Sequence, residues 1–252
     1  MGFAVSADAY DRFMGRYSVP LANCFADFAM VGGEERVADI GCGPGALTAE
    51  LTKRLRMAAV SAVDPSEQFV TAARQRFPEV DIRKASAEEL PFEDGIFDTT
   101  LAQLVVHFMT DPVQGLGEMK RVTRAGGTVG ACVWDHAGEK GPLHVFWQAA
   151  RQLDPDAPDE SELAGAREGH LAELLREAGL AEVEQDALTV AVEHPSFEEW
   201  WEPFTLGVGP AGSHVVGLSD EQRSELRELC RRMLGPAPFT ISATAWAARG
   251  KA

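Results

Sequence analysis

Short apolar runs alternate with amphipathic stretches along the first half of the chain. Runs of four to eight mainly apolar residues predict strands, and apolar residues recurring every three or four positions predict helices. The predicted strands are 36–40, 58–63, 80–84, 97–102 and 127–134, the last after a turn at Gly126-Gly127. The predicted helices are 20–30, 46–55, 66–77 and 111–123, with Ser66 and Asp111 as N-caps. The pattern therefore predicts alternating strands and helices.

The second half of the chain is less regular. Helices are expected at 142–153, 169–178, 196–204 and 219–234, the last capped by Ser219, and strands at 183–192 and 240–248. An acidic, proline-containing loop is expected at 154–166. No internal repeat or low-complexity tract interrupts this order.

Alternation of this kind predicts an α/β fold, in which a parallel sheet carries helices on both faces. Ligands bind such sheets at the carboxyl ends of the strands. Four separate segments place polar or glycine residues there: Asp39 with Gly41, Asp64, Ser86 with Ala87, and Gln103. The sequence therefore predicts one binding site at this edge of the sheet.

Three alternate glycines, Gly41, Gly43 and Gly45, follow the first strand of this series directly. Glycine reaches positive φ without strain and lets a ligand approach bare backbone. With Ala46 and the downstream Asp64 the run also fits a dinucleotide-binding fingerprint. Asp39 favours a different ligand, because a carboxylate here repels phosphate and attracts an ammonium or sulfonium group.

The chain resembles the class I S-adenosylmethionine-dependent methyltransferases, and is most similar to their small-molecule branch, which includes ubiquinone- and menaquinone-biosynthesis enzymes. Residues 39–45, 60–64, 87–92 with Phe97-Asp98, and 10–18 carry the resemblance, which runs from about 10 to about 135. It implies a doubly wound, mostly parallel seven-stranded sheet of Rossmann-like type. An antiparallel C-terminal hairpin would pair 183–192 with 240–248, and a helical insertion would span 195–238.

The resemblance implies S-adenosylmethionine as the cofactor. Asp64, followed by Pro65, would bind the ribose hydroxyls, and Asp39 the amino-acid end above the three glycines. Ser86, Ala87 and Glu88 would lie at the adenine, where family members often have Asp in place of Ser86. Gln103 would lie near the methionine moiety, and Arg16 and Tyr17 would close over its carboxylate as a lid.

Catalytic residues are less clearly indicated. Methyl transfer needs a general base only if the acceptor is a hydroxyl or a weakly acidic carbon or nitrogen. Candidates near the expected site are His107, Asp135, His136 and His144. His107 stands among apolar residues, so a packing role is open as well. Trp134, Trp147, Trp200 and Trp201 suit either an apolar substrate pocket or the core.

Composition narrows the partners. A net charge of −16 over 252 residues disfavours nucleic acid and anionic membranes. Cys24, Cys42, Cys132 and Cys230 are scattered without metal-ligand spacing, so no metal site and a reducing, cytoplasmic location are expected. No apolar stretch reaches the roughly 20 residues of a membrane helix. A monomer or homodimer is expected.

These observations predict a lid at 1–30, a cofactor-binding core at 31–135 and a substrate-side region at 136–252. The predicted function is methyl transfer from S-adenosylmethionine to a small, partly apolar molecule. Two alternatives stay open: an NAD(P)-dependent oxidoreductase, and a protein that binds S-adenosylmethionine without catalysis.

Overall fold

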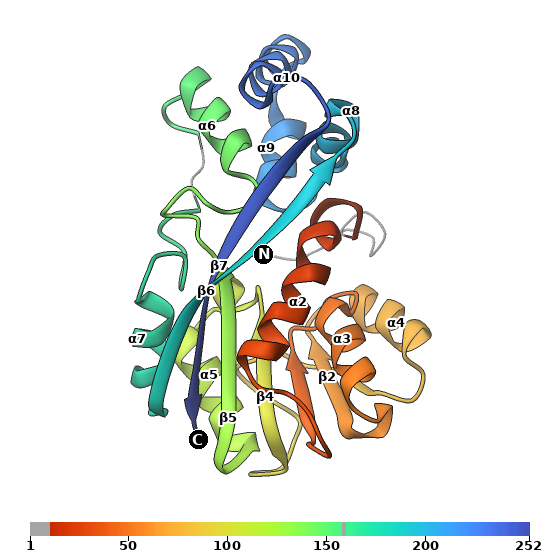
Figure 1. Ribbon diagram of the computed structural model, residues 1–252, viewed down its shortest axis with the longest axis vertical. Helices are drawn as coiled ribbons and strands as arrows, with labels where there is room; N and C mark the ends of the chain where they lie inside the picture. Colours follow the sequence, from red (N-terminus) through yellow and green to blue (C-terminus); the bar gives the residue numbers. More distant parts are fainter. Residues whose placement is uncertain (1–10, 158–159) are drawn as a thin grey trace.

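A seven-stranded sheet of order β3-β2-β1-β4-β5-β7-β6 forms the centre of the molecule in the computed structural model, which describes residues 11–157 and 160–252 (Figure 1). The strands are β1 (Val37–Ile40), β2 (Val60–Asp64), β3 (Asp81–Lys84), β4 (Phe97–Gln103), β5 (Thr123–Trp134), β6 (Ala181–His194) and β7 (Phe239–Lys251). Strands β1 to β5 pair in parallel, and β7 pairs antiparallel with both β5 and β6. The predicted α/β class and the antiparallel C-terminal hairpin are thereby confirmed.

Helices cover both faces of the sheet. The α-helices are α2 (Arg16–Phe28), α3 (Ala46–Arg54), α4 (Glu67–Arg76), α5 (Pro112–Val122), α6 (His144–Leu153), α7 (His170–Glu177), α8 (Phe197–Trp201), α9 (Gly209–Gly217) and α10 (Asp220–Leu234). Shorter helical segments are η1 (Asp11–Gly15), η2 (Met57–Ala59), η3 (Val106–Phe108) and η4 (Glu202–Leu206). Side chains on successive strand residues point to opposite faces. Leu101 accordingly packs in the cluster with α2, α3 and α4, and Ala102 in the cluster with α5 and α7.

Strands β6 and β7 run far beyond the other strands and carry a second group of helices at the upper end of Figure 1. Helices α8, α9 and α10 lie in the chain between these two strands, inside the segment 195–238 for which an insertion was expected, and α6 packs beside them. Aromatic residues pack within this group, where Phe146 of α6 and Phe204 of η4 stack with ring centroids 4.6 Å apart. Phe204 also contacts Phe13 of η1, with ring centroids 5.0 Å apart. The hairpin is longer than the predicted strands 183–192 and 240–248, because the two backbones keep pairing where the apolar alternation stops.

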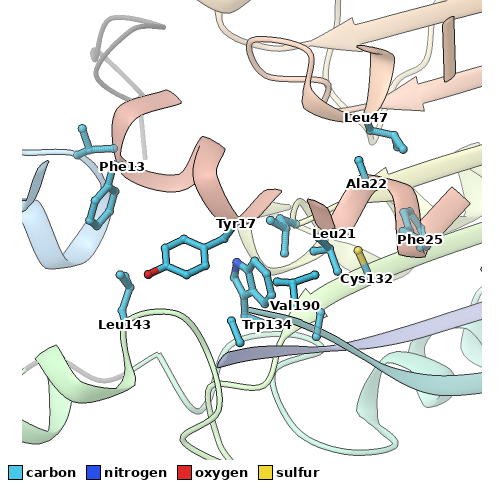
Figure 2. Packing of buried hydrophobic residues seen from close by; sticks show 14 of the residues in the cluster. Phe13, Tyr17, Leu21, Ala22, Phe25, Leu47, Cys132, Trp134, Leu143 and Val190 are labelled. Carbon is cyan, nitrogen blue, oxygen red and sulfur yellow. The ribbon is translucent and has the colours of Figure 1, made fainter. Parts of the chain in front are cut away.

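The N-terminal helix differs from its prediction at 20–30. Helix α2 begins at Arg16 and contains Pro20, which has no N–H to donate within the helix. Leu21, Ala22 and Phe25 are fully buried, and this packing outweighs the missing hydrogen bond (Figure 2). The first ten residues of the expected lid lie outside the described residues.

The turn predicted at Gly126-Gly127 is wrong as a strand boundary, because both glycines lie inside β5. The pairing of β4 with β5 shifts between Phe97↔Thr123 and Thr99↔Thr128, so the extra residues form a bulge. Gly126 has φ +74° there, which explains why the sequence looked like a turn. The predicted N-caps are confirmed: Ser66, Asp111 and Ser219 each accept a backbone N–H of the first helical turn.

Candidate functional site

A cleft opens at the carboxyl ends of β1, β2 and β4. It is lined by Ser18, Asp39, Gly41, Cys42, Gly43, Pro44, Ala46, Leu47, Asp64, Pro65, Phe69, Gln103, Leu104, Val105 and Phe108. Residues from helix α2, from the loop that follows β1 and from the ends of β2 and β4 therefore meet in one place. The position agrees with the edge that the sequence predicts.

The three glycines of the loop between β1 and α3 have different surroundings. All have positive φ: +74° at Gly41, +53° at Gly43 and +97° at Gly45. A Cβ atom at Gly41 would lie 2.5 Å from Val105, and one at Gly45 would lie 2.5 Å from Phe77, so packing alone requires these two. A Cβ atom at Gly43 would meet no protein atom within 4 Å. Gly43 therefore presents bare backbone to open space in the cleft.

Asp39 is buried at the bottom of the cleft, with 1% of its surface exposed. Thr48 on α3 donates a hydrogen bond of 2.6 Å to Oδ2. Burial, helped by the nearby charge of Asp64, raises the pKa of Asp39 to about 7. The carboxyl group is therefore close to half-ionised at neutral pH, and a bound cation would favour its ionised form.

Three oxygen atoms of the cleft residues are buried without a hydrogen-bond partner in the described chain: Ser18 Oγ, Asp39 Oδ1 and Gln103 Oε1. Gln103 is held in place because its Nε2 donates to the Ser18 carbonyl at 3.0 Å. Buried polar atoms normally have partners, so these oxygens indicate a ligand that donates hydrogen bonds. A carboxylate and an amide oxygen suit an ammonium group and disfavour a phosphate.

Asp64 is buried where β2 ends and serves the loop as well as the cleft. Its carboxylate accepts the N–H groups of Gly43 and Ser66, both at 2.8 Å. Burial raises its pKa above the ordinary value, and these two hydrogen bonds oppose that rise. Asp64 therefore positions the glycine loop and still lines the cleft together with Pro65.

Gly45 and two further groups of predicted cofactor residues do not line the cleft. Arg16 and Tyr17 point to the end of β6, where they contact the two ring nitrogens of His194 at 3.0 Å and 2.8 Å. The segment 86–88 lies past β3, and the carboxylate of Glu88 accepts the N–H of Thr110 at 2.8 Å. In the same segment Ala87 is buried in the core and Ser86 is exposed.

A second cavity adjoins the cleft. It is lined by Phe13, Met14, Leu104, His107, Phe108, Trp134, His136, Pro142, Leu143, Glu160, Val208, Gly209 and Pro210. Leu104 and Phe108 line both spaces and so mark the junction. Leu104 has φ +61°, which is rare for a residue with a Cβ, and such strain is common where a binding site needs a particular backbone.

The catalytic candidates separate into two groups. His107 and His136 line the second cavity, with ring centroids 6.0 Å apart. Burial and the neighbouring His136 lower the pKa of His107 to about 3, so this imidazole is neutral at physiological pH. Asp135 lines neither space: its carboxylate accepts the N–H of Gly138 at 2.8 Å and lies 3.8 Å from Lys140 Nζ.

His144 lines a smaller cavity next to the second one, and Glu160 lines both. Glu160 is buried and accepts a 2.7 Å hydrogen bond from Trp147 Nε1. Sequence reasoning missed Glu160, because it stands in a loop whose acidity suggested exposure. It also missed Ser18, Leu104 and Phe108, although Ser18 is adjacent to the predicted Tyr17. The sequence did contain a signal for two of them, because Ser18 lies on the predicted lid segment and Leu104 directly follows the predicted Gln103.

Residues 38–130 match the model of a methyltransferase domain. An uncharacterized methyltransferase of Mycobacterium tuberculosis is 33% identical over 140 residues, 56% of this chain and 54% of that relative. The chain thus spans about half the length of the curated relatives it matches first.

Two solved structures share the fold. One is described as a methyltransferase of Bacillus halodurans; it has a TM-score of 0.61 and 16% identity, and the match covers 91% of this chain and 97% of that one. The other is described as an S-adenosylmethionine-dependent methyltransferase of Thermotoga maritima, with a TM-score of 0.53, 19% identity and coverage of 97% and 98%. Residues 38–130 thus match a methyltransferase domain, and the chain as a whole shares the fold of solved methyltransferase structures, one of them described as S-adenosylmethionine-dependent.

Within residues 11–157 and 160–252, no helix is long and apolar enough to cross a membrane. The same part of the chain contains no group of three His, Cys, Asp or Glu residues placed to hold a metal ion. Cys42, Cys132 and Cys230 are buried free thiols, and Cys24 is a half-buried one.

Proposed function

We propose that the protein transfers the methyl group of S-adenosylmethionine to a small, partly apolar molecule. The observation that carries this proposal is the set of partnerless oxygens on Ser18, Asp39 and Gln103, in a cleft that opens into a mainly apolar cavity. The cofactor supplies a methyl group on a sulfonium centre with a neutral thioether as the leaving group. The protein supplies binding, alignment and exclusion of water.

The residues of the cleft fit that cofactor by their chemistry. Asp39, Ser18 and Gln103 would accept hydrogen bonds from the ammonium group of its amino-acid end. Asp64 would bind the ribose hydroxyls, and Gly43 would leave room for the ligand against the backbone. The side chains of Arg16, Tyr17 and Glu88 have other partners here, so the first group of contacts has the stronger support.

Positioning can supply most of the catalysis. Holding two reactants in line contributes roughly 7–11 kcal/mol to lowering a barrier, without any charged catalytic group. His107 and His136 are the predicted candidates that line the acceptor-side cavity, and Asp135 does not line it. A general base, where the acceptor needs one, is therefore proposed among these two histidines.

The alternatives meet specific obstacles. The pyrophosphate of a nicotinamide dinucleotide would lie against the carboxylates of Asp39 and Asp64. A protein that only binds S-adenosylmethionine has no need of the second cavity joined to the cleft. A cytoplasmic location, a monomeric or homodimeric state, and kinship with the quinone-biosynthesis branch stay predictions.

Titration calorimetry with S-adenosylhomocysteine tests the cofactor site. We expect micromolar affinity, and at least tenfold weaker binding in Asp64→Ala, because hydrogen bonds to a charged group contribute about 1.5–3 kcal/mol each. Glu177→Ala, which removes an exposed charge on α7, should bind normally. Normal binding by Asp64→Ala would remove the ribose assignment. Heat from NAD⁺ and none from S-adenosylhomocysteine would overturn the proposed function.

Turnover is a separate question from binding. Transfer of labelled methyl groups from S-adenosylmethionine to a small-molecule extract should yield labelled products. If the protein binds the cofactor tightly but transfers no labelled methyl group to any molecule of the extract, it is a cofactor-binding protein rather than an enzyme.

A further inference from the structure

The second cavity has mainly apolar walls, yet two of its side chains bring buried polar atoms without a partner among the described residues. These atoms are His107 Nδ1 and Trp134 Nε1. The indole of Trp134 is 2% exposed, and Figure 2 shows it beside Tyr17 and Val190, which belong to other segments. Such atoms in a cavity wall indicate the polar groups that an occupant must bring.

The two atoms need partners of opposite kinds, an acceptor for Trp134 Nε1 and a donor for His107 Nδ1. An indole N–H can only donate, so Trp134 requires an acceptor on the ligand. The imidazole of His107 is neutral, and its Nδ1 can accept a hydrogen bond when the ring proton is on Nε2. A hydroxyl group has the chemistry for both roles, because it can donate to His107 and accept from Trp134. An ammonium group cannot accept from Trp134, and the nitrogen of a neutral arylamine accepts only weakly because its lone pair is delocalised into the ring. An ether or ketone cannot donate to His107.

We propose that the methyl acceptor is a neutral, apolar molecule carrying a hydroxyl group, which donates to His107 Nδ1 and accepts from Trp134 Nε1. This inference rests on the proposed function and specifies its substrate class. His107 lies in η3, and its neighbours Leu104 and Phe108 line both spaces, so a hydroxyl at His107 lies beside the junction with the cofactor cleft.

The remaining walls agree with a neutral ligand. Phe13, Met14, Leu143 and Val208 provide apolar surface for the body of the molecule. The carboxylate of Glu160 would repel an anion, and its hydrogen bond from Trp147 gives it a partner without a ligand.

Trp246 provides a matched control for the indole. Its Nε1 is also buried without a partner in residues 11–157 and 160–252, but Trp246 lies in β7 and lines neither the cleft nor the second cavity. A partnerless indole N–H therefore indicates a ligand acceptor only where the indole lines the cavity, as Trp134 does and Trp246 does not. Replacing each tryptophan by phenylalanine removes one N–H group and keeps an aromatic ring.

The test measures equilibrium binding of three bicyclic probes by calorimetry, with and without S-adenosylhomocysteine: 2-naphthol, 2-naphthylamine and 2-methoxynaphthalene. We expect 2-naphthol to bind about tenfold or more tightly than the methyl ether, which leaves His107 unpaired. Trp134→Phe and His107→Phe should each weaken 2-naphthol binding about two- to tenfold. Trp246→Phe should leave it unchanged.

The outcomes separate the two proposals. If the amine or the ether binds as tightly as 2-naphthol or more tightly, while S-adenosylhomocysteine still binds, the hydroxyl assignment is wrong. The same holds if both Trp134→Phe and His107→Phe still prefer 2-naphthol over the ether as strongly as the wild type does. Absence of S-adenosylhomocysteine binding overturns the proposed function instead. If a variant fails to fold, the comparison of the three probes on the unmodified protein still decides the case.

Discussion

Asp39 has one oxygen bonded to Thr48 and the other without a partner, at the bottom of a cleft that we assign to a cationic cofactor. A buried carboxyl group resists ionisation, which explains the raised pKa. Because the folded pKa exceeds the unfolded value of about 4, ionisation of Asp39 costs stability as the pH rises from about 4 to about 7. A cationic ligand offsets this cost.

Affinity for S-adenosylhomocysteine should therefore rise with pH. Below pH 7 Asp39 is mainly protonated and attracts the ligand's ammonium group less, so binding at pH 6 should be about tenfold weaker than at pH 8. Calorimetry across this range measures the effect. Asp39→Asn should bind weakly at every pH, with the step between pH 6 and 8 lost.

Thr48→Val is the graded control for this pH dependence. It removes the hydroxyl that stabilises the ionised carboxylate, so the midpoint of the affinity curve should move to higher pH. Asp64 and Cys42 also face Asp39 electrostatically. A wild-type affinity that stays level from pH 6 to 8 would show that Asp39 does not contact the charged end of the ligand.

At the scale of elements, helix α2 is attached to the last residue of the edge strand β6, which is His194. An arginine can only donate, so Nδ1 of His194 accepts from Arg16, and Nε2–H then donates to the hydroxyl of Tyr17. Burial and the charge of Arg16 lower the pKa of His194 to about 4. The neutral ring therefore connects α2, which also brings Ser18 to the cleft, to β6.

Acidification should loosen this connection. Because the folded pKa of His194 lies below the unfolded value of about 6.5, its contribution to stability is present above pH 6.5 and is lost as the pH falls towards 4. His194→Gln keeps an acceptor for Arg16 and a donor for Tyr17 but cannot titrate. Urea unfolding at pH 7 and pH 5 should show a smaller loss of stability in His194→Gln than in the wild type.

Tyr17→Phe completes the comparison, since it removes one hydrogen bond at both pH values. We expect it to cost about 0.5–1.5 kcal/mol at pH 7 and to keep most of the wild-type pH dependence. Identical losses on acidification in the wild type and in His194→Gln would show that His194 does not titrate with unfolding.

At the scale of the whole molecule, the cleft joins segments that are far apart in the sequence: Ser18 in α2, Asp39 and Gly43 around β1, Asp64 in β2 and Gln103 in β4. A ligand that contacts all of them binds the folded state alone and so stabilises it by mass action. The second cavity adds residues from the substrate side, such as Leu143 and Val208.

Thermal unfolding should report this linkage. At a free concentration of S-adenosylhomocysteine one hundred times the dissociation constant, the folded state gains about 2.7 kcal/mol, which raises the Tm of a chain of this size by about 5–10 °C. NAD⁺ should leave the Tm unchanged, and Asp39→Asn should respond only at higher ligand concentration. A shift with NAD⁺ equal to that with S-adenosylhomocysteine would argue against the assigned cofactor.

The sequence by itself determined the alternation of strands and helices, the binding edge of the sheet, the N-caps and the resemblance to methyltransferases. These features depend on local periodicity, on capping side chains and on glycine, which act within a few residues. Position along the strands also predicted that Asp39, Asp64 and Gln103 lie at one edge of the sheet, and all three line the cleft there, because parallel strands bring their carboxyl ends together.

Only the tertiary structure decided which residues share a cavity. Arg16 and Tyr17 turn to His194 while the next residue, Ser18, lines the cleft, because one position along a helix rotates a side chain by about 100°. His107 and Trp134 meet at one cavity from separate segments, and Glu160 joins them from an acidic loop. Burial and contacts between distant segments set these relations, and local pattern carries no information about either.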